Sequence, residues 1–341
     1  MVPFSEAPQL ERRDFVANAN DSHWLTQPEV PLEGFSPLYG KERTPRSTRT
    51  RMNLTMLTSV GPDAPSGEDG RFTLEELQGA MFSNQEMLER LLRDAVVERC
   101  NTVTQVTYEG RPVDIQDICN VIATWDGMAN LDSVGAVAWR EFIGDFDSED
   151  LVDAGDLFAV PFDPENPVNT PNTLARKRKR DPVLQALAAA VTRLEQAGLA
   201  VDVTLRECQY TLKGEEAIPV HGGHGFEGLF NVVGFVDDPL YNSTLLPKVA
   251  QAEVVNDRTD LSTEGYLMNY GASFVMALEF TDAGPRAKAL LTYSQSANSE
   301  SPFYADQTRL YSEEIWRDIR FSEADIASDP ALVVYELSSS D

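Results

Sequence analysis

Two histidines separated by two glycines, His221-Gly-Gly-His224, form the local sequence most suggestive of chemistry. Two imidazoles at this spacing could ligate a metal ion, with Glu227 as a candidate third ligand. The same segment could form a tight structural turn, because glycine readily adopts the positive φ angles that such turns require. We favour the turn, and we expect this chain to hold no metal and no other cofactor.

Two charged runs also allow both a functional and a structural interpretation. The acidic run over residues 145–150 has the composition of a calcium loop, but it lacks the order of an EF-hand and its central glycine. The basic run over residues 176–180 reads RKRKR and could be a processing site or an anion site. Isolated basic runs are weak signals, so we predict solvated loops for both segments.

The three cysteines are Cys100, Cys119 and Cys208. Cys100 ends one predicted helix and Cys119 lies within the next, so a disulfide is geometrically feasible if the two helices are antiparallel. Two buried thiols are the alternative, since the redox compartment is unknown. Cys208 is expected to be a small, buried apolar residue. The sequence contains no Cys-x-x-Cys pair, nucleophile elbow, P-loop or dinucleotide fingerprint.

Composition excludes several classes of protein. The chain has 341 residues, 28 Lys and Arg against 55 Asp and Glu, and a net charge of −27. Nucleic-acid binding needs clustered positive charge, so we predict none. With 42% hydrophobic residues the chain can build a large core and is neither disordered nor a disulfide-dense miniprotein. No apolar stretch is long enough to cross a bilayer, and the first residues do not read as a signal peptide.

Helices are predicted for much of residues 73–200. Thr73 and Glu76 fit a capping box, and an apolar stripe at helical spacing continues to residue 100. Further helices are predicted over residues 114–125 and 137–143, and from Pro182, with Asp181 as N-cap, to just before Gly198.

Strands are predicted after residue 200, over residues 201–205, 209–212, 229–235, 273–281, 287–294 and 316–321. The segments 273–281 and 287–294 are apolar at most positions, which predicts a hairpin buried on both faces. Helices followed by strands, without βαβ alternation, indicate an α+β fold. We divide the chain into an extended covering segment over 1–72, a helical region over 73–200 and a β-rich region over 201–341. The three regions are expected to form one structural unit.

A collinear series of segments resembles the penicillin acylase family of N-terminal-nucleophile hydrolases, particularly its acyl-homoserine lactone and aculeacin acylase branch. The first segment, residues 12–25, reads RRDFVANANDSHWL. The series continues through residues 31–35, 46–51, 125–133, 221–225, 230–232, 271–276, 291–296 and 304–309. An ordered series over nearly the whole chain is far more specific than one short motif.

The resemblance implies hydrolysis of an N-acyl amide, such as an acyl-homoserine lactone, a lipopeptide or a β-lactam amide. Quorum quenching or antibiotic metabolism would then be the biological context. In this family a chain-initial serine is the nucleophile and its own α-amine is the base, since an α-amine titrates near neutral pH. The family's oxyanion-hole asparagine falls on Asn20. Its supporting arginine falls on Arg49, with Arg46 or Arg51 as alternatives because the alignment there needs a gap.

The sequence departs from the family at the nucleophile. It does not begin with Ser, Thr or Cys, and Ser83-Asn84 lies within a predicted helix. We therefore expect the serine and much of the family's αββα sandwich to lie on an upstream part of the acylase. That upstream part would be the chain's partner, and the chain alone would be inactive and would expose apolar surface. A non-catalytic remnant acting as a binding module is the alternative.

The resemblance also bears on location and on the cysteines. These acylases are commonly exported, so we expect a periplasmic or secreted protein. The related branch looks to have cysteines in the same two helical regions, which strengthens the case for a Cys100–Cys119 disulfide in an oxidising compartment.

Overall fold

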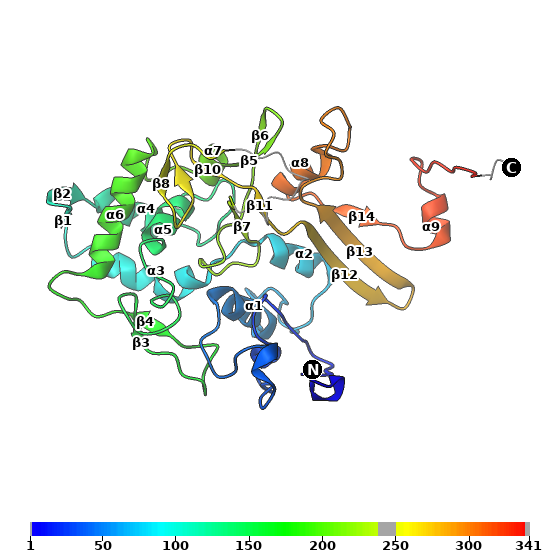
Figure 1. Cartoon of the computed structure of the whole chain (residues 1–341), viewed down its shortest axis with the longest axis horizontal. Coiled ribbons are helices and arrows are strands. Elements are labelled where there is room, and N and C mark those ends of the chain that lie inside the picture. Colours follow the sequence, from blue (N-terminus) through cyan, green and yellow to red (C-terminus); the bar gives the residue numbers. More distant parts are fainter. Residues whose placement is uncertain (1, 238–249, 338–341) are drawn as a thin grey trace.

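Helices and short strands are both present in the computed structural model of the chain, which describes residues 2–237 and 250–337. The helices are α1 (Thr48–Thr58), α2 (Leu74–Phe82), α3 (Met87–Cys100), α4 (Gln116–Thr124), α5 (Ala136–Ile143), α6 (Pro182–Gln196), α7 (Leu205–Cys208), α8 (Asp306–Ser312) and α9 (Glu323–Ala327). This mixture agrees with an α+β class (Figure 1).

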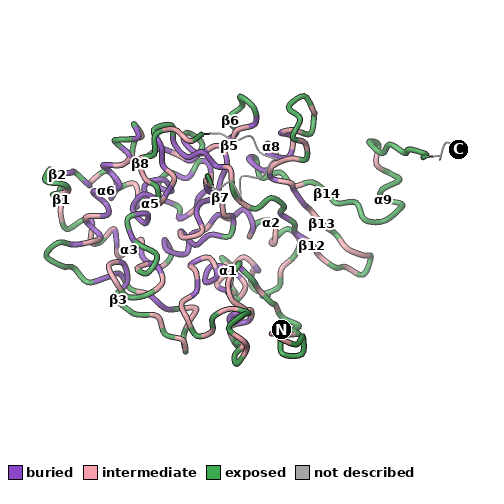
Figure 2. Tube along the Cα trace, viewed as in Figure 1, coloured by how far each residue is buried: buried purple, intermediate pink, exposed green. Residues whose placement is uncertain are grey.

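The strands form small separate sheets. They are β1 (Gln105–Tyr108), β2 (Arg111–Asp114), β3 (Phe158–Val160), β4 (Asn172–Leu174), β5 (Gln209–Lys213), β6 (Glu216–Pro219), β7 (Val233–Gly234), β8 (Val254–Asn256), β9 (Leu261–Ser262), β10 (Tyr266–Leu267), β11 (Tyr270–Gly271), β12 (Phe274–Thr281), β13 (Gly284–Leu291) and β14 (Arg317–Ile319). The main core lies among α3, α4, α5 and α6, where buried residues gather in Figure 2.

The predicted helix over residues 73–100 is wrong in one respect, because it is two helices. The capping box at Thr73 and Glu76 is present and begins α2. The chain then breaks at Asn84, which is fully buried at φ +49°. Ala129 donates a backbone hydrogen bond to Asn84, and Glu86 donates one to Gly127. Contact with a segment over 40 residues away thus interrupts a pattern that is continuous in the sequence.

The helices predicted from local signals are confirmed. α4 and α5 lie where they are expected, and α6 begins at Pro182 with the Asp181 side chain accepting a hydrogen bond from the N–H of Val183. The strand predicted over residues 201–205 is wrong. That segment leads into α7, where Thr204 and Glu207 form a second capping box.

The hairpin predicted near the end of the chain is confirmed as β12 and β13, and β14 pairs with the other edge of β13. The expectation that it is buried on both faces is wrong. Val275 and Ala277 are buried, whereas Phe274 and Met276 are each 53% exposed and Phe280 is 83% exposed. The difference arises because α2 and α8 pack against this sheet and leave one face uncovered.

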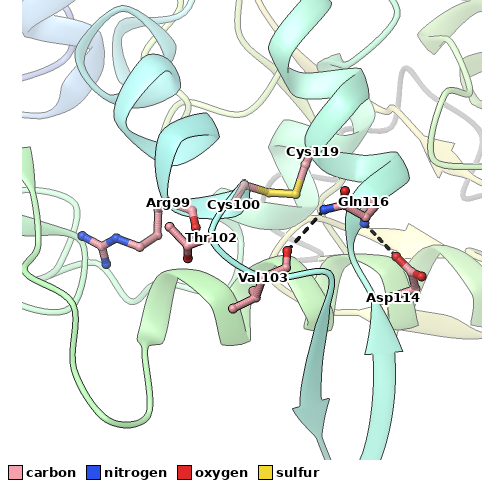
Figure 3. Close-up of a disulfide and its surroundings, with 7 residues drawn as sticks. All are labelled: Arg99, Cys100, Thr102, Val103, Asp114, Gln116 and Cys119. Atoms are coloured by element: carbon pink, nitrogen blue, oxygen red, sulfur yellow. Dashed lines mark hydrogen bonds between the residues drawn. A yellow bond between two sulfur atoms is a disulfide. The ribbon is translucent and has the colours of Figure 1, made fainter.

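A disulfide joins the last residue of α3, Cys100, to Cys119 in α4 (Figure 3). The two Cα atoms are 5.9 Å apart and both residues are buried. Gln116 Nε2 donates a hydrogen bond to the carbonyl of Val103 in the same connection. Cys208 is buried as a free thiol, and burial raises its pKa to about 12.

Removing this disulfide should destabilise the chain by about 3 kcal/mol, because closing a loop of this length restricts the unfolded state. We expect this loss of unfolding free energy in urea for the Cys100→Ala/Cys119→Ala variant and for the reduced wild type. Cys208→Ala, which removes the free thiol, is the control and should respond to reductant as the wild type does. An unfolding midpoint for the wild type that reduction leaves unchanged would contradict the prediction.

Candidate active site

The segment that carries Asn20 is a tight turn. Asn20 lies at φ +57°, in the left-handed region that asparagine tolerates better than most residues. Its backbone N–H donates to Asn18 Oδ1 at 2.8 Å. The turn follows Ala17, whose N–H donates to the carbonyl of Thr26 at 2.8 Å. These local bonds present the Asn20 side chain at the surface.

Asp21 fastens this turn to the start of α1. Its carboxylate accepts hydrogen bonds from the N–H groups of Ser22 and Ser47, from Thr50 Oγ1 and from Arg46 Nη1. Burial alone would raise the pKa of Asp21. The two amide bonds and the charge of Arg46 outweigh that effect and hold the pKa below its usual range. The Asn20 turn is therefore tied to the N-terminal turn of α1.

Arg49, in that first turn of α1, contacts the Asn20 turn directly. Its Nη2 donates to the carbonyl of Ala19 at 2.5 Å and to Asn20 Oδ1 at 3.0 Å. A guanidinium can only donate, so the Asn20 side chain must face it with its oxygen. No oxygen of the described residues accepts a hydrogen bond from Asn20 Nδ2. Asn20 Nδ2 is therefore a neutral amide donor without an acceptor in the described part of the chain, and Arg49 fixes the orientation of this side chain through Asn20 Oδ1.

The two alternative arginines have other partners. Arg46 is buried, donates to Asp21 and lies over the ring of Trp24. Arg51 is buried and points the other way, with its Nε donating to the carbonyl of Val168 at 2.9 Å. Neither bonds Asn20 in the structure. Of the three arginines, only Arg49 donates a hydrogen bond to the Asn20 side chain.

An apolar pocket of about 400 Å³ opens beside the Asn20 turn. The turn contributes Asn18, and α1 contributes Asn53, one helical turn beyond Arg49. The remaining wall is largely apolar and comes from α1, α2, β12 and the loop before β7: Met56, Leu57, Leu77, Ala80, Met81, Phe230, Met276, Ala277 and Leu278. The pocket thus joins the candidate site to the uncovered face of the hairpin.

The histidine loop is occupied by structural hydrogen bonds. His221 Nε2 donates to the carbonyl of Tyr311 at 2.8 Å, and its Nδ1 accepts from the amides of Asn84 and Asn231. His224 Nε2 lies 2.8 Å from the carbonyl of Thr259. Gly222 adopts φ +94° and lies against Asn231, as a tight turn requires. In residues 2–237 and 250–337, no group of three or more His, Cys, Asp or Glu side chains is arranged to hold a metal ion.

These histidines predict a loss of stability in acid. Burial lowers the pKa of His221 to about 4 and that of His224 to about 3. Above pH 6.5 histidine is neutral in both folded and unfolded chains, so it has no effect there. Between pH 6.5 and 4 only the unfolded chain binds the proton, and each histidine costs up to about 1.4 kcal/mol per pH unit.

Urea unfolding of the wild type and His221→Gln at several pH values tests this prediction. The variant loses hydrogen bonds at every pH, but its stability should fall less steeply between pH 6.5 and 4. His23→Gln, which changes a histidine beside Glu42, is the control. Identical slopes for the wild type and His221→Gln would refute the expectation.

A buried ionic cluster that was not predicted from the sequence holds the histidine loop. Arg140, in α5, donates to both oxygens of Glu227, to Gln209 Oε1 and to the carbonyl of Gly222. Burial disfavours the charge on Arg140, but the neighbouring acidic groups, with Glu227 contributing most, together outweigh that effect and hold the pKa of Arg140 above its usual value. Two adjacent charged residues, Arg140 and Glu141, within an otherwise apolar helix were the available signal. The acidic run over residues 145–150 is a separate loop, in which Asp147 Oδ1 accepts hydrogen bonds from the N–H groups of Glu149 and Asp150.

Comparisons with known proteins place these residues in a family context. The family model described as penicillin amidase matches residues 1–328. Aculeacin-A acylase of Actinoplanes utahensis is 36% identical over 334 residues, which are 97% of this chain and 38% of the relative. An acyl-homoserine lactone acylase PvdQ of Pseudomonas savastanoi pv. phaseolicola is 30% identical over 346 residues, which are 99% of this chain and 39% of the relative.

The chain therefore spans less than two-fifths of the length of these curated relatives. A thermostable penicillin G acylase from Alcaligenes faecalis is similar over 95% of this chain and 57% of its own, with 14% identity and a TM-score of 0.39. A structural similarity of that size carries no argument about the fold or the site.

Proposed function

This chain belongs to the penicillin amidase family, and from that membership we propose that it is part of an N-acyl amide hydrolase to which it contributes the oxyanion donor. Asn20 would be that donor and Arg49 the residue that orients it. One observation carries the proposal: Arg49 holds Asn20 Oδ1, while Asn20 Nδ2 has no acceptor among the described residues.

The chemistry assigns the remaining roles to the rest of the acylase. The hydroxyl of a chain-initial serine attacks the amide carbon and passes its proton to the serine's own α-amine. The carbonyl oxygen becomes an oxyanion, and Asn20 Nδ2 donates to it. The C–N bond then breaks, the amine leaves with a proton, and water releases the acid from the acyl ester. An amide donor preorganised for the oxyanion is worth about 3–4 kcal/mol.

The uncovered face of the hairpin supports an upstream partner segment. β12 is an edge strand with Phe274 and Met276 exposed, and Met276 also lines the apolar pocket beside the Asn20 turn. An edge strand with an apolar face invites pairing with another strand. We propose that the upstream part of the acylase covers this face and completes the αββα sandwich, with residues 1–72, 73–200 and 201–341 contributing as one unit.

The substrate class follows from the family and from the relatives' names. An aculeacin-A acylase and acyl-homoserine lactone acylases are among the relatives, so we propose an N-acylated small molecule or lipopeptide as substrate. A periplasmic or secreted location fits that assignment. No helix within the described part of the chain is long and apolar enough to span a bilayer.

Expression of the chain together with its upstream coding sequence tests the proposal. Fluorescamine would report the primary amine released from an N-acyl-homoserine lactone. We expect release by the extended protein and none by residues 1–341 alone. An upstream region without an acylase-like reading frame, or an extended protein without amidase activity, would instead favour the non-catalytic binding module.

A further inference from the structure

We propose that residues 176–180, the basic loop, form a cleavage site for an endopeptidase that cuts after Lys or Arg, and that the cut chain remains folded as a complex of two fragments. The loop has no part in the proposed amide hydrolysis. Its sequence offers five successive Lys or Arg residues in a chain of net charge −27. A protease pocket that holds one basic side chain against a carboxylate can therefore engage this loop in any of five registers.

The backbone of the basic loop is free to enter a protease. All five residues are exposed, and they lie between β4 and α6 outside any helix or strand. No backbone N–H or C=O of residues 176–180 is hydrogen bonded to another described residue. Peptides commonly bind in an extended form through backbone hydrogen bonds, so this segment can bind without first breaking bonds of its own. Exposed loops of this kind are preferred sites of proteolytic nicking.

The basic side chains are only loosely held. Arg176 and Lys179 make no hydrogen bond or ion pair with any described residue. Lys177 donates to Thr102, Arg180 donates to Gln185, and Arg178 binds Asp156 and Gly155. These few contacts are at the surface, where ion pairs contribute little. A protease pocket could therefore take several of these side chains at small cost.

The segments on either side of the loop are firmly anchored. Before it, β4 pairs with β3 through Leu174 and Phe158. After it, Asp181 caps α6 and forms an ion pair with Arg99, with Arg99 Nη1 2.8 Å from Asp181 Oδ2. Most residues of α6 are buried against the core. The Cys100–Cys119 disulfide lies within the first fragment and cannot link the two. The fragments would stay together through packing and through buried contacts such as Arg140 to Glu227.

The cleavage itself is simple hydrolysis. Water adds to the carbonyl carbon of the basic residue, and the peptide C–N bond to the next residue breaks. The hydroxyl of the water stays on the new carboxyl group, and its proton goes to the new α-amine. No cofactor or redox partner is required. The product would be a chain with one new carboxylate and one new ammonium group in the loop.

Limited digestion of the folded chain with trypsin tests the proposal. We expect the first cut within residues 176–181, shown by N-terminal sequencing, and two fragments of nearly equal length that co-elute at the position of the uncut chain. Circular dichroism of the cut chain should match that of the uncut chain. A first cut elsewhere, or fragments that separate or unfold, would overturn the proposal.

Matched variants separate the site from general accessibility. Replacement of all five basic residues by glutamine should slow the appearance of the half-length fragments by about tenfold or more, because cleavage of a folded chain then needs local opening. Arg12→Gln/Arg13→Gln, which changes another exposed basic pair, should leave their rate unchanged. Equal rates for the fivefold variant and the wild type would overturn the assignment, provided circular dichroism shows both to be folded.

Discussion

Replacing Arg140 by methionine is expected to lower the free energy of unfolding by about 3–5 kcal/mol, the largest effect on stability that the structure predicts. Arg140 and Glu227 are both fully buried, with Arg140 Nε 3.0 Å from Glu227 Oε1. Methionine is close in volume but cannot balance the carboxylate. Burial raises the pKa of Glu227 and Arg140 opposes the rise, so without the arginine the carboxyl must either protonate or remain charged and unpaired.

A neighbouring carboxyl makes the dependence on Arg140 sharper. Glu86 is fully buried, and neither of its carboxyl oxygens has a hydrogen-bond partner among the described residues. Burial and the nearby charge of Glu227 raise the pKa of Glu86 well above its usual value, and Arg140 opposes the rise. Arg140→Met therefore removes the cation that stabilises the charge on both buried carboxyl groups, Glu227 and Glu86.

The control is an arginine with equally good geometry at the surface. Arg206 binds both oxygens of Asp132, at 2.6 and 2.7 Å, but half of its side chain is exposed. Arg206→Met should cost no more than about 1 kcal/mol, since water solvates the carboxylate that remains. Equal losses for the two variants in urea unfolding would contradict the view that burial sets the effect.

If Asn20 is the oxyanion donor that we propose, removing its side chain should lower kcat of the acylase by about 10²–10³, because the oxyanion loses a preorganised donor. Asn20→Gly is the informative change, since glycine accepts the φ of +57° without strain, whereas alanine would add a backbone cost. Amine release from the N-acyl substrate measures the effect. Full activity of the variant would contradict the oxyanion role of Asn20.

Glu109 provides the matched control for this change. It is an exposed residue at φ +49° in the turn between β1 and β2. Glu109→Gly makes the same backbone replacement far from the candidate site and should leave kcat unchanged. Both variants should alter the unfolding free energy by less than about 1 kcal/mol, because neither side chain is buried.

Several elements follow from local signals in the sequence. The start of α2 depends on Thr73 and Glu76, and the start of α6 on Asp181 and Pro182. Each signal acts between residues within one helical turn, so the rest of the chain is not needed to interpret it. Asn20 was predicted as a site residue for a similar reason, because it lies in a short motif, residues 12–25, that resembles the family.

Other features were decided only by the tertiary structure. The break at Asn84 depends on residues 127–129, and the exposed face of β12 depends on which helices reach the sheet. The role of Arg140 needed Glu227, 87 positions away, which no local pattern connects to it.

The candidate site divides in the same way. From the sequence, the family resemblance predicted membership of the penicillin amidase family, which the family model confirms. It also predicted Asn20 as the oxyanion asparagine and Arg49 as its supporting residue, with Arg46 or Arg51 as alternatives. Arg46 lies just before α1, whereas Arg49 and Arg51 lie within it. Only the tertiary structure shows which of these arginines contacts Asn20, because the attachment of Asp21 to Ser47 and Thr50 sets which face of α1 meets the Asn20 turn, and that face carries Arg49.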